Sequence, residues 1–177
     1  MRRLIVLTLL VSGAAVFETG CKSSRRARVT TVEEESGALR SRLELSDPAT
    51  AIQLVKGFHQ LEPDGWRWTM GQFTVTLLVP KEAAKKGGKL KVELTYPEPV
   101  LAKLGAATLK ASVDGLALEP QTYSAAGGTT YEREIPASAL GGETVTIDFS
   151  LDKFLNAGDV EERELGMIVS AFELSSQ

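Results

Sequence analysis

The sequence has few of the residues that most enzyme chemistry requires. Its 177 residues include one cysteine, Cys21, and one histidine, His59. A single cysteine excludes a disulfide within the chain, and a single histidine excludes a metal site built from several histidines. Neither a Gly-x-Ser-x-Gly motif nor a Gly-x-x-x-x-Gly-Lys-Ser/Thr phosphate loop is present. We therefore predict a non-catalytic protein without a cofactor or catalytic metal; a hydrolase that uses His59 in a Ser-His-Asp triad is the least favoured alternative.

The chain also has no excess of basic charge, since its 20 Lys and Arg are outnumbered by 23 Asp and Glu and the formal net charge is −3 at pH 7. Proteins that bind nucleic acids present a concentrated basic face. The longest cluster, five lysines from Lys81 to Lys91, is typical of a solvated loop. We expect no nucleic-acid partner.

The sequence has no apolar run of the length that a transmembrane helix needs, which is about 20 residues. Its main apolar run extends from Leu4 to Phe17 and follows Met1-Arg2-Arg3. A basic start followed by a short apolar run is typical of a signal peptide. The segment predicts export of the remaining chain.

Thr19 and Gly20 stand directly before Cys21. The segment resembles the lipobox of bacterial lipoproteins, although Glu18 stands where an aliphatic residue is usual. The resemblance implies that residues 1–20 are a signal peptide and that Cys21 becomes the lipidated N-terminus. The protein would then be anchored by lipid to a membrane of the cell envelope. An ordinary signal peptide with a chance cysteine, or an uncleaved anchor, remains an alternative.

After this segment two regions of different composition follow. Residues 21–38 are polar, with a basic block before an acidic block, and predict a flexible tether. Residues 39–177 contain short runs in which apolar and polar residues alternate, as in half-buried strands. Gly-rich and Asp-Gly turns separate the runs, and Val113-Asp114-Gly115-Leu116 predicts a tight hairpin. We predict a single all-β domain, an antiparallel β-sandwich of jelly-roll type. The alternating runs are residues 43–45, 73–79, 90–96, 109–113, 144–151 and 165–174.

Two segments hold the candidate ligand-binding residues. The first contains both tryptophans and the only histidine, and the second is an acidic loop with one arginine before the last predicted strand. Indoles stack on the apolar faces of sugars, while carboxylates and guanidinium groups bind hydroxyls. We expect Arg163 to pair with Glu62. The candidates are His59, Glu62, Trp66, Arg67, Trp68 and Arg163.

The same residues also allow a structural interpretation. Trp66 and Trp68 lie two residues apart, so they face the same side of a strand and both could pack on the core, while Arg67 faces the other side. His59 could be a hydrogen-bonded structural residue, and an arginine near acidic residues often forms an ion pair that holds a loop. Asp148, Asp152 and Asp159 are candidates for a structural calcium by residue type alone.

Several short motifs follow one another along residues 52–174. They are Gly57, Phe58, Glu62, Arg67, Trp68, Thr69, Val113, Asp114, Gly115, Ile135, Pro136, Glu161, Arg163, Leu165 and Gly166. In this order the chain resembles a group of bacterial β-sandwich modules that occur beside glycosyltransferases and in cell-envelope polysaccharide systems. The resemblance implies a module similar to carbohydrate-binding jelly-rolls. A structural or assembly lipoprotein that contacts an envelope protein is the alternative.

Overall fold

The computed structural model describes residues 38–177, and within them nine strands and four short helical segments follow one another. The predicted signal peptide, Cys21 and nearly all of the predicted tether lie outside the described residues. The strands are β1 (Arg42–Glu44), β2 (Leu54–Phe58), β3 (Arg67–Leu78), β4 (Gly88–Tyr96), β5 (Ala107–Val113), β6 (Leu116–Tyr123), β7 (Gly127–Ile135), β8 (Thr144–Leu151) and β9 (Ile168–Ser176). The helical segments are η1 (Pro48–Gln53), α1 (Ala83–Lys86), α2 (Glu98–Leu104) and η2 (Ala137–Ala139). None of the helices in this part of the chain is long and apolar enough to cross a membrane.

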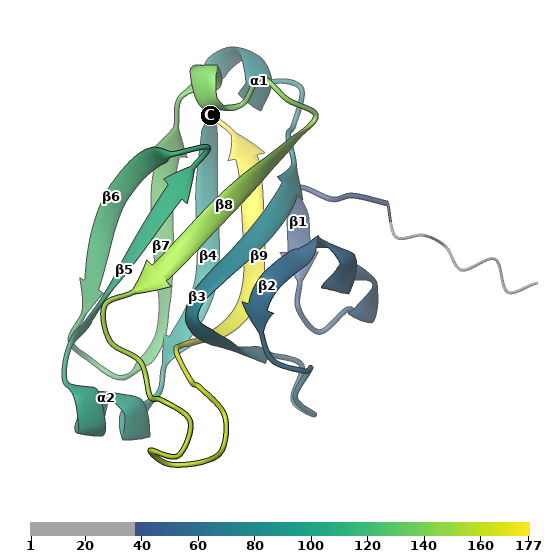
Figure 1. The fold of residues 1–177 in the computed structure, drawn as a ribbon. Helices are drawn as coiled ribbons and strands as arrows, with labels where there is room; N and C mark the ends of the chain where they lie inside the picture. The colour runs from purple at the N-terminus through teal and green to yellow at the C-terminus, as the bar shows by residue number, and fades with distance from the viewer. Residues whose placement is uncertain (1–37) are drawn as a thin grey trace, which may run out of the picture. The chain divides into compact units, whose positions relative to one another are not determined.

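The strands form two antiparallel layers that share β3. The first residues of β3, Arg67 and Trp68, pair with β9, whereas Gln72 to Leu78 pair with β8. One layer therefore has the order β1-β9-β4-β7, and the other has the order β2-β3-β8-β5-β6 (Figure 1). This confirms the predicted all-β sandwich.

Inward-facing side chains at alternate strand positions form the core between the layers. The ring of Phe73 on β3 stacks on Phe149 of β8, with centroids 4.8 Å apart. Phe149 also contacts Phe172 of the opposite layer, at 5.8 Å. The burial of these alternate residues follows from the period of two that the sequence shows.

Side chains also link the layers at the edge opposite β3, where β6 and β7 lie next to each other. The guanidinium of Arg133 donates hydrogen bonds to the carbonyls of Glu119 and Pro120 at 2.6 and 2.9 Å. The hydroxyl of Tyr131 donates to the carbonyl of Glu119 at 2.9 Å. Arg133 in turn lies over the Tyr131 ring, 4.4 Å from its centroid. These contacts bring the two free edges together without a strand ladder.

The local predictions are confirmed in most places. The Asp114-Gly115 turn joins β5 to β6 with φ of 47° and 84°, the geometry of a type I′ hairpin, which Asp-Gly favours. Two short helices, α1 and α2, precede β4 and β5. Not every Gly-rich segment is a turn, because Gly127 and Gly128 pair with β4 as the start of β7.

Candidate functional site

A tight turn after β2 sets the position of the first tryptophan. The N–H of Glu62 donates to the carbonyl of Trp66 at 2.9 Å, and that of Gly65 donates to the carbonyl of Glu62 at 3.0 Å. The chain then enters β3, where the carbonyl of Trp68 accepts from the N–H of His59 at 2.9 Å. The turn therefore returns the chain beside the end of β2.

The two indoles lie edge to face, with centroids 6.0 Å apart and an interplanar angle of 79°. Both side chains are half-buried, and Trp68 packs against the core. The expectation that they share one side is confirmed. Burial of Trp68 against the core makes its role partly structural, whereas Trp66 is not part of that core.

Arg67 is turned toward the turn itself. Its Nη1 donates to the carbonyl of His59 at 3.0 Å, while its Nε is buried and has no hydrogen-bond partner within residues 38–177. The guanidinium therefore holds the first residue after β2 in place.

His59 holds the loop between β8 and β9. Its Nε2 lies 2.6 Å from the carbonyl of Glu164. Because a carbonyl only accepts, Nε2 carries the hydrogen in this contact. The carboxylate of Glu164 accepts from the N–H of Gly71 at 2.7 Å, so Glu164 links the loop to both β2 and β3. The candidate residues chosen from the sequence do not include Glu164.

Arg163 lies between two carboxylates. Its Nη1 donates to Glu62 at 2.9 Å, which confirms the expected pair, and its Nε and Nη2 donate to the two oxygens of Glu161. The hydrogen bonds from Arg163 are the main cause of a lowered pKa of Glu161. The same contacts, with Glu161 first, raise the pKa of Arg163. The charges of this triad therefore stabilise one another.

The structure thus brings all six candidates to one edge of the sandwich, but it gives most of them internal partners. His59, Arg67 and Arg163 make hydrogen bonds that hold two loops, and only the indoles offer large half-buried surfaces without a polar partner.

The three aspartates considered for calcium do not form one site. Asp148 accepts from the Thr74 hydroxyl and Asp152 from the N–H of Thr108, while Asp159 accepts from the N–H of Asn156. Within residues 38–177 no group of three or more His, Cys, Asp or Glu is placed to hold a metal ion.

No protein-family model matches this chain, and no curated protein matches its sequence. Among solved structures, it is similar to a family GH115 4-O-methyl-alpha-glucuronidase, with 10% identity and a TM-score of 0.49, covering 79% of this chain and 18% of that chain. It is also similar to the family 35 carbohydrate-binding module from Clostridium thermocellum, with 12% identity and a TM-score of 0.44, covering 76% of this chain and 98% of that one. A third is a carbohydrate-binding module CBM36, in complex with calcium and xylotriose, with 10% identity, a TM-score of 0.40 and coverage of 76% and 98%. The chain therefore spans less than a fifth of the glucuronidase and nearly all of each module.

Proposed function

We propose that this protein is a non-catalytic carbohydrate-binding module of the cell envelope, held on a membrane by lipid attached to Cys21. The observation that carries the binding proposal is the pair of half-buried indoles beside the Glu62–Arg163–Glu161 triad. An indole face contributes apolar surface to a sugar ring, and charged planar groups beside it bind hydroxyls.

The fixed geometry of this edge supports binding. His59, Glu164 and Arg163 hold the two loops before any ligand arrives, so little conformational entropy is lost on association. The side chains of Glu62 and Arg163 remain 24% and 39% exposed, so sugar hydroxyls can reach both groups. Trp66 supplies the stacking surface, and Trp68 supports it from the core side.

The test is retention of the full-length protein, in detergent, on a glycan array. Trp66→Ala should abolish retention while the thermal midpoint barely moves, because Trp66 lies outside the core. Leu116→Ala, at a residue 43% exposed in the β5–β6 hairpin, is the matched control for loss of an exposed apolar side chain. Unchanged retention of Trp66→Ala on every glycan that the parent protein binds would contradict this site.

The anchoring proposal rests on the lipobox resemblance and has its own test. In cells fed a labelled fatty acid, the parent protein should carry label and sediment with membranes. Cys21→Ser should remove the label, because the thiol is the acceptor, and Ser23→Ala should keep it. A Cys21→Ser protein that still carries the label would contradict lipidation at this position.

A further inference from the structure

The outer face of the β2-β3-β8-β5-β6 layer carries a groove that the sequence patterns do not reveal. Its volume is about 450 Å³. Most of the lining side chains are those that alternate with core residues and therefore point away from the core. The lining residues are Lys56, Gln72, Thr74, Lys110, Ala111, Ser112, Ala117, Asp148, Phe149 and Ser150.

Strand register arranges these residues in two rows across the sheet. In one row Lys56 pairs with Thr74, Thr74 with Asp148, Asp148 with Ser112, and Ser112 with Ala117. The neighbouring row is Gln72, Ser150 and Lys110. The short side chains between the two lysines leave the face hollow.

The floor of the groove is polar and fixed. Thr74 is 3% exposed, and its hydroxyl donates to the Asp148 carboxylate at 2.6 Å. Asp148 is exposed, so its second oxygen is accessible to a ligand hydroxyl. Gln72, Ser112 and Ser150 add further hydrogen-bonding groups.

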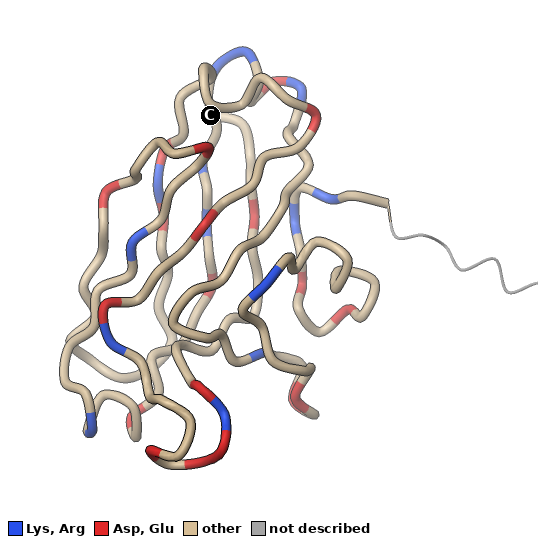
Figure 2. Tube along the Cα trace, viewed as in Figure 1, with Lys and Arg blue, Asp and Glu red and all other residues tan. Residues whose placement is uncertain are grey.

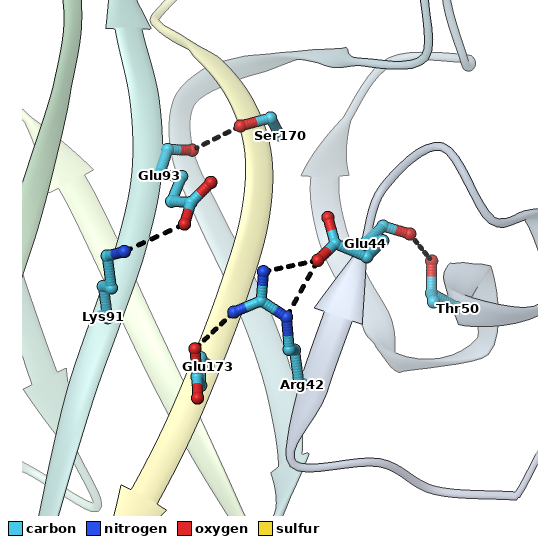
Figure 3. Close-up of polar contacts among 7 residues, drawn as sticks. All are labelled: Arg42, Glu44, Thr50, Lys91, Glu93, Ser170 and Glu173. Atoms are coloured by element: carbon cyan, nitrogen blue, oxygen red, sulfur yellow. Dashed lines mark hydrogen bonds and ion pairs between the residues drawn. The ribbon is translucent and has the colours of Figure 1, made fainter.

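The charges of this face differ from those of the opposite layer. On the outer face of the β1-β9-β4-β7 layer the cations have carboxylate partners: Arg42 contacts Glu44 and Glu173, and Lys91 lies 3.0 Å from Glu93 (Figure 3). In the groove, Lys56 and Lys110 are exposed and have no carboxylate within 4.0 Å among residues 38–177. Figure 2 shows few charged positions along β3, β5 and β8, in contrast to the loop between β8 and β9. The groove therefore holds two unneutralised cations in an otherwise acidic chain.

The distance between the cations limits the ligand. Lys56 is on β2 and Lys110 is on β5, three strand spacings away, which is about 14 Å. One small anion can contact both lysines only when both side chains extend toward each other across the polar floor. A chain with hydroxyls along its length and carboxylates at intervals can contact both lysines and the polar floor.

We propose that this groove binds a segment of an acidic polysaccharide, with uronate carboxylates on Lys56 and Lys110 and sugar hydroxyls on Asp148 and its neighbours. This site is separate from the edge of the sandwich that carries Trp66 and Trp68, the tryptophan edge, and rests on different residues. The groove binds the charged chain, and its polar floor favours hydroxylated polymers over other polyanions.

Binding of the full-length protein in detergent to polygalacturonate, with neutral dextran for comparison, tests the proposal. The double variant Lys56→Gln/Lys110→Gln should bind polygalacturonate about tenfold more weakly, because both ionic hydrogen bonds are lost. Lys81→Gln/Lys85→Gln removes the same charge from outside the groove and should change affinity by no more than about twofold. Ser112→Tyr fills the groove without a change of charge and should also weaken binding, whereas Thr130→Tyr on the other layer should not.

Three results would overturn this proposal. The first is equal binding by the Lys56/Lys110 variant and the parent protein, and the second is an equal loss in the Lys81/Lys85 control. The third is displacement of the polymer by inorganic phosphate at the same charge concentration, which would define a simple anion site. Trp66→Ala should keep polygalacturonate binding. Its failure on neutral glycans would concern only the tryptophan edge.

Discussion

Gly166, in the loop before β9, lies so close to β3 that there is no room for a side chain at this position. A Cβ at this position would lie 2.7 Å from both the carbonyl oxygen of Met70 and the hydroxyl of Thr69. Real Cβ atoms do not approach backbone oxygen so closely, so the backbone of β3 must shift. We expect Gly166→Ala to lower the free energy of unfolding by about 2 kcal/mol in urea titrations.

Gly141→Ala is the matched control for this substitution. A Cβ there meets nothing within 4 Å, so its unfolding midpoint should equal that of the parent protein. Equal midpoints for both variants would show that the loop before β9 accommodates the methyl group, and the close approach would then have no energetic consequence.

Individual residues of the site were predictable to different degrees. The Glu62–Arg163 pair could be foreseen because opposite charges on two candidate loops are visible in the sequence. The double role of Glu164 could not, since its partners are the N–H of Gly71 and the ring of His59. A backbone N–H has no sequence signature, so contacts of this kind emerge only when the fold brings the segments together.

At the scale of elements, the loop between β8 and β9 depends on Arg163. This side chain holds Glu161 within the loop and Glu62 on the neighbouring turn. We expect Arg163→Gln to speed hydrogen exchange in residues 156–165, while the strands exchange as before. The global midpoint should move little, because the Arg163 side chain is 39% exposed and solvent screens its ion pairs.

Glu162→Gln is the control within the same loop, since Glu162 is exposed and makes no ion pair within residues 38–177. It should leave exchange unchanged. Faster exchange of the strands in Arg163→Gln, or no change in the loop, would contradict this role.

Acid should loosen the same loop. Because Arg163 lowers the pKa of Glu161, the folded state favours the carboxylate, and its stabilisation is complete above the ordinary pKa of glutamate. The contribution is lost as the pH falls through the lowered pKa. We expect tryptophan fluorescence to change as the pH falls below about 4, before the sandwich unfolds. In Arg163→Gln this early step should be absent; its persistence would assign it to another group.

Strands with a regular alternation of apolar and polar residues could be predicted from the sequence, and strands without it could not. β5 and β8 alternate apolar and polar residues throughout, and the Asp-Gly turn fixes the end of β5. β7 was missed because its core-facing positions are mostly polar, with only Tyr131 and Ile135 buried. β2 was missed because it is short and only half-buried, and Gly57 breaks its register with β3. Tertiary pairing, rather than local pattern, defines these two strands.

At the scale of the whole described domain, the two outer faces divide the charged residues differently. The β1-β9-β4-β7 face pairs its cations with its own carboxylates, as Figure 3 shows for Arg42 and Lys91. The opposite face leaves Lys56 and Lys110 unneutralised above a polar floor. This asymmetry could not be foreseen, because strand order across the sheet decides which lysines find carboxylates. The cations of one face already have carboxylate partners, whereas those of the other face are available to a ligand.

The fold also predicts sensitivity to alkali, because all three tyrosines of the chain are buried. Burial raises the pKa of Tyr96, Tyr123 and Tyr131, so the folded state keeps each phenol protonated when the unfolded chain ionises. The unfolded state then binds fewer protons, and stability is complete below about pH 10 and falls as the pH rises toward the raised pKa values. We expect the urea midpoint to drop steeply above about pH 10, with tyrosinate absorbance appearing together with unfolding. Tyr123→Phe should flatten this drop, because its hydroxyl makes only a long hydrogen bond of 3.4 Å and the ring can remain in place. Tyrosinate absorbance with an ordinary pKa in a chain that is still folded would contradict the prediction.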